Sequence, residues 1–129
     1  MKAQELMIGD WVKFPHGIDK VVDLPYVEGE GLCASFAASA TLFPVRIDII
    51  APIPLTPEIL ENNGLKHLYT YGTDKWICDN IRLNVYSSDN TWRFCADTKG
   101  NEETVIYIHY IHELQHALRL CGIEKEITL

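Results

Sequence analysis

The sequence lacks the long apolar segments and the basic charge that mark two large classes of protein. No stretch of signal-peptide length stands at the N-terminus, and no run approaches the roughly 20 apolar residues that a membrane span needs. Lysine and arginine total 11 against 18 aspartate and glutamate residues, which gives a formal net charge of −7. This balance argues against a general role in coating DNA or RNA, because such proteins present a basic surface. We therefore expect a cytoplasmic protein that does not enter a membrane.

The motifs of several chemical classes are also missing. A zinc ribbon is excluded because no two of the four cysteines form a CxxC knuckle. Their apolar neighbours predict reduced, partly buried thiols. Gly29 and Gly31 form only a fragment of a phosphate-binding loop, and no serine stands in a G-x-S-x-G elbow. The cysteines are Cys33, Cys78, Cys95 and Cys121.

The composition is that of a folded domain. The chain has 129 residues, of which 47% are apolar and 22% charged. These values exclude a disordered tail and a coiled-coil rod. A chain of this length can bury enough surface to fold without a metal or a disulfide. One domain, or two small subdomains that share a core, is expected.

Short β-rich segments separated by turn residues fill the first fifty residues. In the last of these segments Val45, Ile47 and Ile49 alternate with polar residues, so we expect these three side chains to point inward. This density of short strands predicts a small β-barrel-like unit, SH3-like, over residues 1–51. The expected strands are residues 11–14, 18–24, 32–36 and 45–49.

A short helix with well-marked ends follows a stiff connector that contains two prolines. Thr56 fits the N-cap position and Pro57 the first helical position. Gly64 suits the left-handed position that ends a helix, and Leu65 is placed to fold back on Leu60. The spacing predicts a helix of about two turns.

The second half of the chain reads as an antiparallel sheet followed by a helix. Apolar and polar residues alternate over residues 81–86, which is typical of a half-buried antiparallel strand. A last helix is expected from about Tyr110 to Cys121, where Gly122 ends it. We therefore predict an α+β fold: the SH3-like unit, then over residues 52–129 an antiparallel sheet with a short helix and a C-terminal helix. The two parts could equally form one continuous domain.

One catalytic motif lies in the last expected helix. His112-Glu113-Leu114-Gln115-His116 matches H-E-x-x-H, in which two imidazoles four residues apart share a helix face and can hold one zinc ion. The glutamate between them can act as general base on the metal-bound water. In this interpretation His112 and His116 are the metal ligands and Glu113 is the catalytic residue of a zinc-dependent hydrolase.

A catalytic zinc also needs a third protein ligand, and no spacing in the sequence supplies one. The extended motif carries Gly and His at positions where this chain has Arg119 and Gly122. A ligand from earlier in the chain, such as His16, His67 or Asp97, is left without a supporting pattern. The missing ligand favours a structural helix over a zinc site.

The helical wheel points the same way. At about 100° per residue, the apolar residues form one stripe, and His109, His112 and His116 fall together on the opposite side. This placement predicts a solvated helix face that carries three histidines and no metal. The apolar stripe consists of Tyr110, Ile111, Leu114, Ala117, Leu118 and Cys121.

Aromatic and basic residues alternate in the second half of the chain. Lys75, Arg82 and Arg93 lie among Trp76, Trp92 and several tyrosines. Aromatic rings and arginines on a sheet can stack single-stranded bases. Acidic residues are interleaved with them, and strand aromatics more often belong to a core. A weak single-stranded nucleic-acid binder is therefore only a second alternative.

Three blocks of sequence resemble a known protein family. Residues 50–60 contain the pattern PIPLT-x-E-x-L, residues 110–115 read YIHELQ and residues 5–12 read ELMIGDWV. Together they resemble a family of small uncharacterised proteins from Bacteroidetes bacteria, their phages and mobile elements, over nearly the whole chain. The family's closing block often reads HQLQN, so the resemblance implies that Glu113 and His116 are peculiar to this chain. It brings no established activity and implies a cytoplasmic, phage-linked accessory role.

The leading functional expectation is a non-catalytic protein-binding or adaptor module that has a protein partner and no cofactor. It rests on the absence of a complete catalytic set and on the small β unit, which is a frequent binding scaffold. The zinc-dependent hydrolase, with zinc as its cofactor, is the first alternative, and the nucleic-acid binder is the second.

Overall fold

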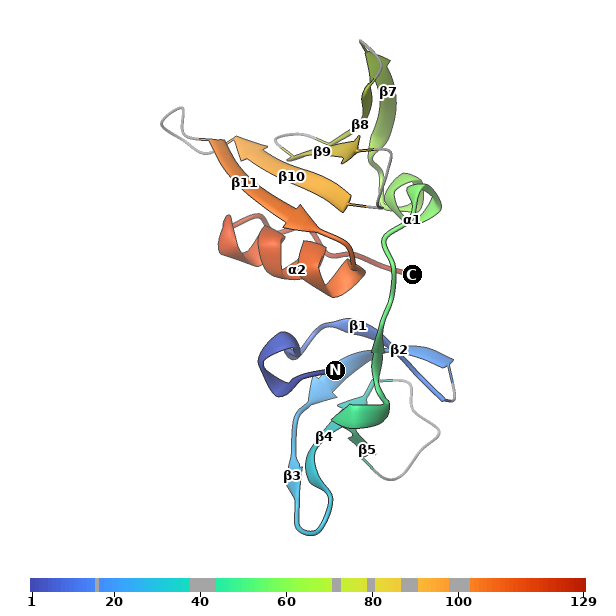
Figure 1. Ribbon diagram of the computed structural model, residues 1–129, viewed down its shortest axis with the longest axis vertical. Coiled ribbons are helices and arrows are strands. Elements are labelled where there is room, and N and C mark those ends of the chain that lie inside the picture. Colours follow the sequence, from blue (N-terminus) through green and yellow to red (C-terminus); the bar gives the residue numbers. More distant parts are fainter. Residues whose placement is uncertain (16, 38–43, 71–72, 79–80, 87–90, 98–102) are drawn as a thin grey trace. The chain divides into compact units, whose positions relative to one another are not determined.

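The structure is a computed structural model in which the chain divides into two compact units, Met1–Ile53 and Pro54–Leu129. The boundary expected from the sequence falls between residues 51 and 52. The fold is α+β, with antiparallel sheets, one short helix and one C-terminal helix, as the sequence predicts. Figure 1 shows the described residues, which are 1–15, 17–37, 44–70, 73–78, 81–86, 91–97 and 103–129.

The first unit is built on a six-stranded sheet of the order β3-β4-β2-β1-β6, with β5 paired to β4. No pairing among its described strands closes this sheet into a barrel, so the SH3-like form is not confirmed. Two 3-10 helices, η1 (Ala3–Glu5) and η2 (Ile47–Ile49), accompany the sheet. The strands are β1 (Trp11–Phe14), β2 (Gly17–Asp23), β3 (Tyr26–Val27), β4 (Gly31–Phe36), β5 (Val45–Arg46) and β6 (Ala51–Pro52).

A small apolar cluster forms the core of the first unit. Phe14 of β1 and Phe36 of β4 stack with ring centroids 4.3 Å apart, and Val12 and Val21 are buried beside them. Asp10, which is also buried, ends the turn that leads into β1: its Oδ2 accepts a hydrogen bond from the backbone N–H of Met7 at 2.8 Å. The carboxylate thereby fixes the entry of the chain into the sheet.

The strand expected over residues 45–49 is wrong in its second half. The strand ends at Arg46, η2 follows, and Ile49 is 49% exposed instead of pointing inward. The amino group of Met1 donates to the carbonyl oxygens of Ile47 and Ile50, both at 2.8 Å. Because the N-terminus lies far away in sequence, alternation alone could not reveal this competing use of the backbone.

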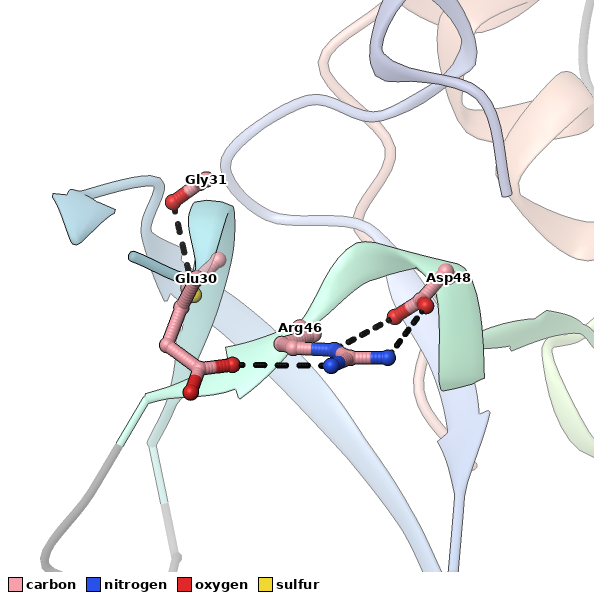
Figure 2. A network of polar contacts seen from close by, with 5 residues as sticks. Glu30, Gly31, Arg46 and Asp48 are labelled. Carbon is pink, nitrogen blue, oxygen red and sulfur yellow. Dashed lines mark hydrogen bonds and ion pairs between the residues drawn. The ribbon is translucent and has the colours of Figure 1, made fainter. Parts of the chain in front are cut away.

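Local side-chain contacts also hold the turn at η2. Arg46 donates two hydrogen bonds to Asp48 (Figure 2), from Nε to Oδ1 at 3.1 Å and from Nη2 to Oδ2 at 2.6 Å. Glu30 lies on the other side of the guanidinium, with Oε2 3.7 Å from Nη1. These hydrogen bonds lower the pKa of Asp48 and raise that of Arg46.

The second unit contains a five-stranded antiparallel sheet in which neighbours in space are neighbours in sequence. Its order is β11-β10-β9-β8-β7, so β7 and β11 are the edge strands. In Figure 1, α2 (red) lies alongside β11, and α1 (green) lies near β7. The elements are α1 (Pro57–Asn62), β7 (Lys66–Thr70), β8 (Thr73–Cys78), β9 (Ile81–Tyr86), β10 (Thr91–Asp97), β11 (Glu103–Ile108) and α2 (Ile111–Leu120).

The short helix α1 confirms its expected caps. The Oγ1 of Thr56 accepts a hydrogen bond from the N–H of Ile59 at 3.3 Å, and Pro57 begins the helix. Gly64 adopts a φ of 85°, and the N–H of Leu65 folds back to the carbonyl oxygen of Leu60 at 3.1 Å. This closed turn carries the chain from the helix into β7.

Strand register divides the side chains of this sheet between two faces, because residues directly opposite each other share a face. We call the face that carries Trp76 the inner face and its opposite the outer face. Most of the inner face over β8, β9, β10 and β11 is apolar and buried, as shown by Trp76, Leu83, Trp92, Phe94 and Ile108. Outer-face positions hold Lys66, Leu68, Lys75, Ile77, Arg82, Arg93, Cys95 and Tyr107.

The cysteines agree with the expectation of partly buried thiols. None of these four described cysteines forms a disulfide; Cys33 and Cys95 are buried, and Cys78 and Cys121 are half-buried. In the part of the chain that the structure describes, neither helix combines the length and the apolar character that crossing a bilayer requires.

Asn63 joins α1 to the C-terminal segment. It is only 8% exposed, and its Nδ2 donates to the carbonyl oxygens of Ile59 at 2.8 Å and Thr128 at 2.9 Å. Its Oδ1 accepts from the N–H of Thr128 at 2.8 Å. Because donor and acceptor both meet the backbone of Thr128, this one amide fixes the C-terminal segment, in which Ile127 is buried.

We expect Asn63→Ala to lower the free energy of unfolding by about 1–3 kcal/mol, because it leaves buried backbone groups without partners. Urea unfolding measures this loss, with Asn62→Ala, an exposed change in the same helix, as the matched control. Equal stability of the two variants would show that the hydrogen bonds between Asn63 and Thr128 do not stabilise the fold.

We expect the contribution of the Arg46–Asp48 pair to the free energy of unfolding to depend on pH. Since the pKa of Asp48 is lowered on folding, the pair stabilises the fold above the usual aspartate pKa and is lost as the pH falls through the lowered pKa. Asp48→Asn should therefore be less stable than wild type at pH 7, with a gap that closes in acid. Urea unfolding between pH 7 and pH 2 tests this prediction.

The control is the double variant that adds Arg46→Gln to Asp48→Asn. It should show the same pH dependence as Arg46→Gln alone, since both lack the Arg46–Asp48 pair and the Arg46–Glu30 contact. A gap between wild type and Asp48→Asn that stays constant down to pH 2 would show that the ion pair contributes nothing.

Candidate functional site

The glutamate of the H-E-x-x-H motif caps its own helix. The Oε1 of Glu113 accepts hydrogen bonds from the backbone N–H groups of His109 at 3.0 Å and Tyr110 at 3.1 Å. Glu113 stands at the third position of α2, and a carboxylate there satisfies donors that the first turn leaves open. This geometry gives Glu113 a structural role that needs no metal.

The expected solvated face of three histidines is wrong for His112, which is only 5% exposed. Its ring stacks on Tyr110 with centroids 5.8 Å apart and meets the ring of His116 edge-on at 5.5 Å. His116 is half-buried and His109 is exposed. An imidazole has an apolar body as well as polar atoms, so hydropathy alone placed His112 on the wrong side.

The structure brings His112 and His116 together but supplies no third metal ligand among the residues it describes. Of the earlier candidates, His67 is hydrogen-bonded to Asp74. His16 and the side chain of Asp97 lie outside the described residues. The described geometry therefore does not assemble a catalytic zinc site, which needs three protein ligands.

A pocket of about 780 Å³ lies elsewhere in the second unit. Its walls combine aromatic rings and prolines with a small number of polar groups, which is the usual composition of a ligand site of this size. Its described lining residues are Pro54, Leu55, Thr56, Pro57, His67, Asp74, Trp76, Trp92, His109 and Tyr110. We call this space the pocket.

The β7–β8 hairpin builds one wall of the pocket. His67 lies directly opposite Trp76, and their rings stack with centroids 4.7 Å apart. Asp74 is two residues before Trp76 on β8, so it shares the inner face. Its Oδ1 lies 2.7 Å from Nε2 of His67. The register thus brings a carboxylate, an imidazole and an indole together.

The second wall is the connector before α1, docked on the segment before α2. Pro54 and Tyr110 form an isolated β-bridge, and the N–H of Leu55 donates to the carbonyl oxygen of His109 at 3.0 Å. The Nε2 of His109 lies 3.1 Å from Oγ1 of Thr91. These contacts bring His109 and Tyr110 next to the connector. Pro54 of the connector and Pro57, the first residue of α1, line the pocket together with them.

The polar groups of the pocket are suited to holding a ligand. The Nε2 of His67 and the Oδ1 of Asp74 lie within hydrogen-bond distance, and a carboxylate paired in this way is oriented by the imidazole. Among the described lining residues there is no serine or cysteine. Thr56 already uses its hydroxyl oxygen to cap α1. A histidine–carboxylate pair without an adjacent nucleophile orients and recognises a ligand more readily than it attacks one.

The basic residues considered for stacking nucleic acid lie on the other side of the sheet. Lys75, Arg82 and Arg93 hold outer-face positions, whereas Trp76 and Trp92 are on the inner face. The two tryptophans are therefore separated from the basic groups, whereas the exposed Tyr107, opposite Arg93, shares the outer face with them.

The His67–Asp74 pair was missed by the sequence analysis, which considered His67 only as a metal ligand. A signal for the pair exists in the hairpin itself. If residues 66–70 and 73–78 pair closely around a short turn, His67 falls opposite Trp76 and next to Asp74. The connector wall has no such local signal, because its partners lie about fifty residues away in sequence.

No family model matches the chain, and neither curated proteins nor solved structures provide a match. The site must therefore be interpreted from its own geometry.

We expect Glu113→Ala to lower the free energy of unfolding by about 1 kcal/mol, because it removes the acceptor of two backbone N–H groups. Glu113→Gln keeps an acceptor oxygen and should lose less. Urea unfolding of both variants checks the order, with Glu124→Ala, an exposed change after the helix, as the control. If Glu113→Ala were as stable as Glu124→Ala, the capping role would be refuted.

Proposed function

We propose that this chain is a non-catalytic protein-binding module and that its second unit receives a segment of a protein partner in the pocket. The observation that carries the proposal is the lining itself: Trp76, Trp92 and Tyr110 with two prolines, and one histidine–carboxylate pair for orientation. Aromatic side chains provide large contact areas at low entropic cost, which is why they dominate binding sites for peptides.

The edge strand β7 offers the partner a backbone to pair with. It is the last strand of the described sheet, and its side chains are exposed, with Tyr69 at 70%. An extended peptide can add to such an edge through main-chain hydrogen bonds while one of its side chains enters an adjacent pocket. His67 belongs to β7 and also lines the pocket, so the two surfaces are continuous.

The wider role we propose follows the resemblance: a cytoplasmic accessory protein of phage or mobile-element type. The first unit, a small sheet of short strands, suits an adaptor in which a second binding surface is separate from the pocket. The hydrolase alternative gains nothing from the described residues, since Glu113 caps α2 and no third ligand joins His112 and His116.

The test is selection of peptides from a random displayed library on the immobilised chain, followed by affinity measurements on variants. Peptides that use the pocket should lose at least tenfold in affinity for His67→Ala and for Tyr110→Ala. Tyr107→Ala is the matched control for Tyr110→Ala, because it removes another exposed tyrosine side chain from the outer face of the sheet, outside the described pocket lining. Peptides that bind all variants equally, or a selection that yields none, would contradict the proposal.

A further inference from the structure

The basic residues of the five-stranded sheet are confined to one face. Every lysine and arginine of its strands stands at an outer-face position: Lys66, Lys75, Arg82 and Arg93. The described lining of the pocket, in contrast, contains one carboxylate, that of Asp74, and no lysine or arginine. A carboxylate without a lysine or arginine in the described lining favours a cationic ligand, as does the chain's formal net charge of −7.

The carboxylate is accessible to a ligand. The side chain of Asp74 is 47% exposed, and its contact with His67 is made through one oxygen, Oδ1. The hydrogen bond between His67 and Oδ1 therefore orients a carboxylate that remains exposed to a ligand.

A second carboxylate stands next to the pocket. The Oε1 of Glu113 lies 3.9 Å from Nδ1 of His109, which is a lining residue. Glu113 also accepts the two backbone hydrogen bonds that begin α2, so its position is fixed. The two carboxylates approach the pocket from the sheet and from the start of the helix.

Aromatic rings supply the remaining walls. The faces of indole and phenol rings carry partial negative charge and attract ammonium and guanidinium groups within about 6 Å of the ring centroid. Trp76, Trp92 and Tyr110 all line the pocket. Rings together with an exposed carboxylate, in the absence of a competing lysine or arginine in the described lining, favour one chemical class of ligand.

We propose that the pocket binds the cationic side chain of a lysine or arginine from the partner segment, with Asp74 as the ion-pair acceptor and the ring of Tyr110, which is 37% exposed, as a cation–π partner. This inference rests on the proposed function and specifies which group of the partner the pocket selects. In this proposal the alkyl stem of such a side chain packs against Pro54 and Pro57, and its charged end reaches Asp74.

The experiment titrates the intact chain with n-butylguanidinium, n-butylammonium and the neutral analogue n-butylurea, and follows the indole N–H signals by NMR. We expect both cations to shift the signals of Trp76 and Trp92 saturably, to leave Trp11 of the first unit unchanged, and to bind at least fivefold more tightly than n-butylurea. Asp74→Asn should remove this preference. Asp48→Asn, which makes the same charge change in the first unit, should keep it.

Equal binding of n-butylurea, an unchanged preference in Asp74→Asn, or no shift of Trp76 and Trp92 would overturn the inference. The displayed peptides separate this failure from that of the proposed function. Peptides that depend on Tyr110 but tolerate replacement of all their lysines and arginines would retain the binding module and refute the cationic ligand. A selection without any pocket-dependent peptide would refute both.

Discussion

The register of the β7–β8 hairpin is the constraint on which the second unit depends. Because side chains alternate between faces, a slip of one residue would move His67 or Trp76 to the opposite side. The observed register places His67 against Trp76 and beside Asp74, and continues through β9 into β10, where Trp92 joins the same face. The same alternation sends the lysines and arginines of the strands outward, so one geometric choice creates the aromatic pocket and separates it from the basic side chains.

The connector, the start of α1 and the segment before α2 supply the lining residues of the pocket that the sheet does not. Glu113 holds the segment before α2 by its backbone, and that segment in turn receives Leu55 of the connector. Glu113, which in the sequence suggests a zinc-dependent hydrolase, thus caps α2 in the structure. By accepting their backbone N–H groups it also fixes His109 and Tyr110, which line the pocket. His112 is buried and its ring contacts those of Tyr110 and His116, so these two histidines contribute to packing.

The elements with local signals could be predicted from the sequence. The caps of α1, the strands of the second sheet and the end of α2 at Gly122 all follow from residues within one turn or one strand. Features that need distant partners could not. The N-terminal amino group reshapes the chain near Ile47, and Asn63 meets Thr128, but nothing local encodes either contact.

The candidate site divides in the same way. Its aromatic residues stood out in the sequence, whereas their separation from the basic residues required the strand register. The H-E-x-x-H motif drew attention to Glu113, but the pattern could not reveal that the carboxylate meets backbone N–H groups. His67 and Asp74 are seven residues apart, and only the pairing of two neighbouring strands makes them partners.

The most direct measurement is therefore of the register itself, by nuclear Overhauser contacts between side chains of the labelled protein. The ring protons of His67 should show strong contacts to the indole of Trp76, and none should connect that indole to Lys66 or Leu68. Contacts from Trp76 to Lys66 or Leu68 would place the indole on the outer face. In that case Trp76 would not line the pocket, and both the proposed binding site and the cationic ligand would be contradicted.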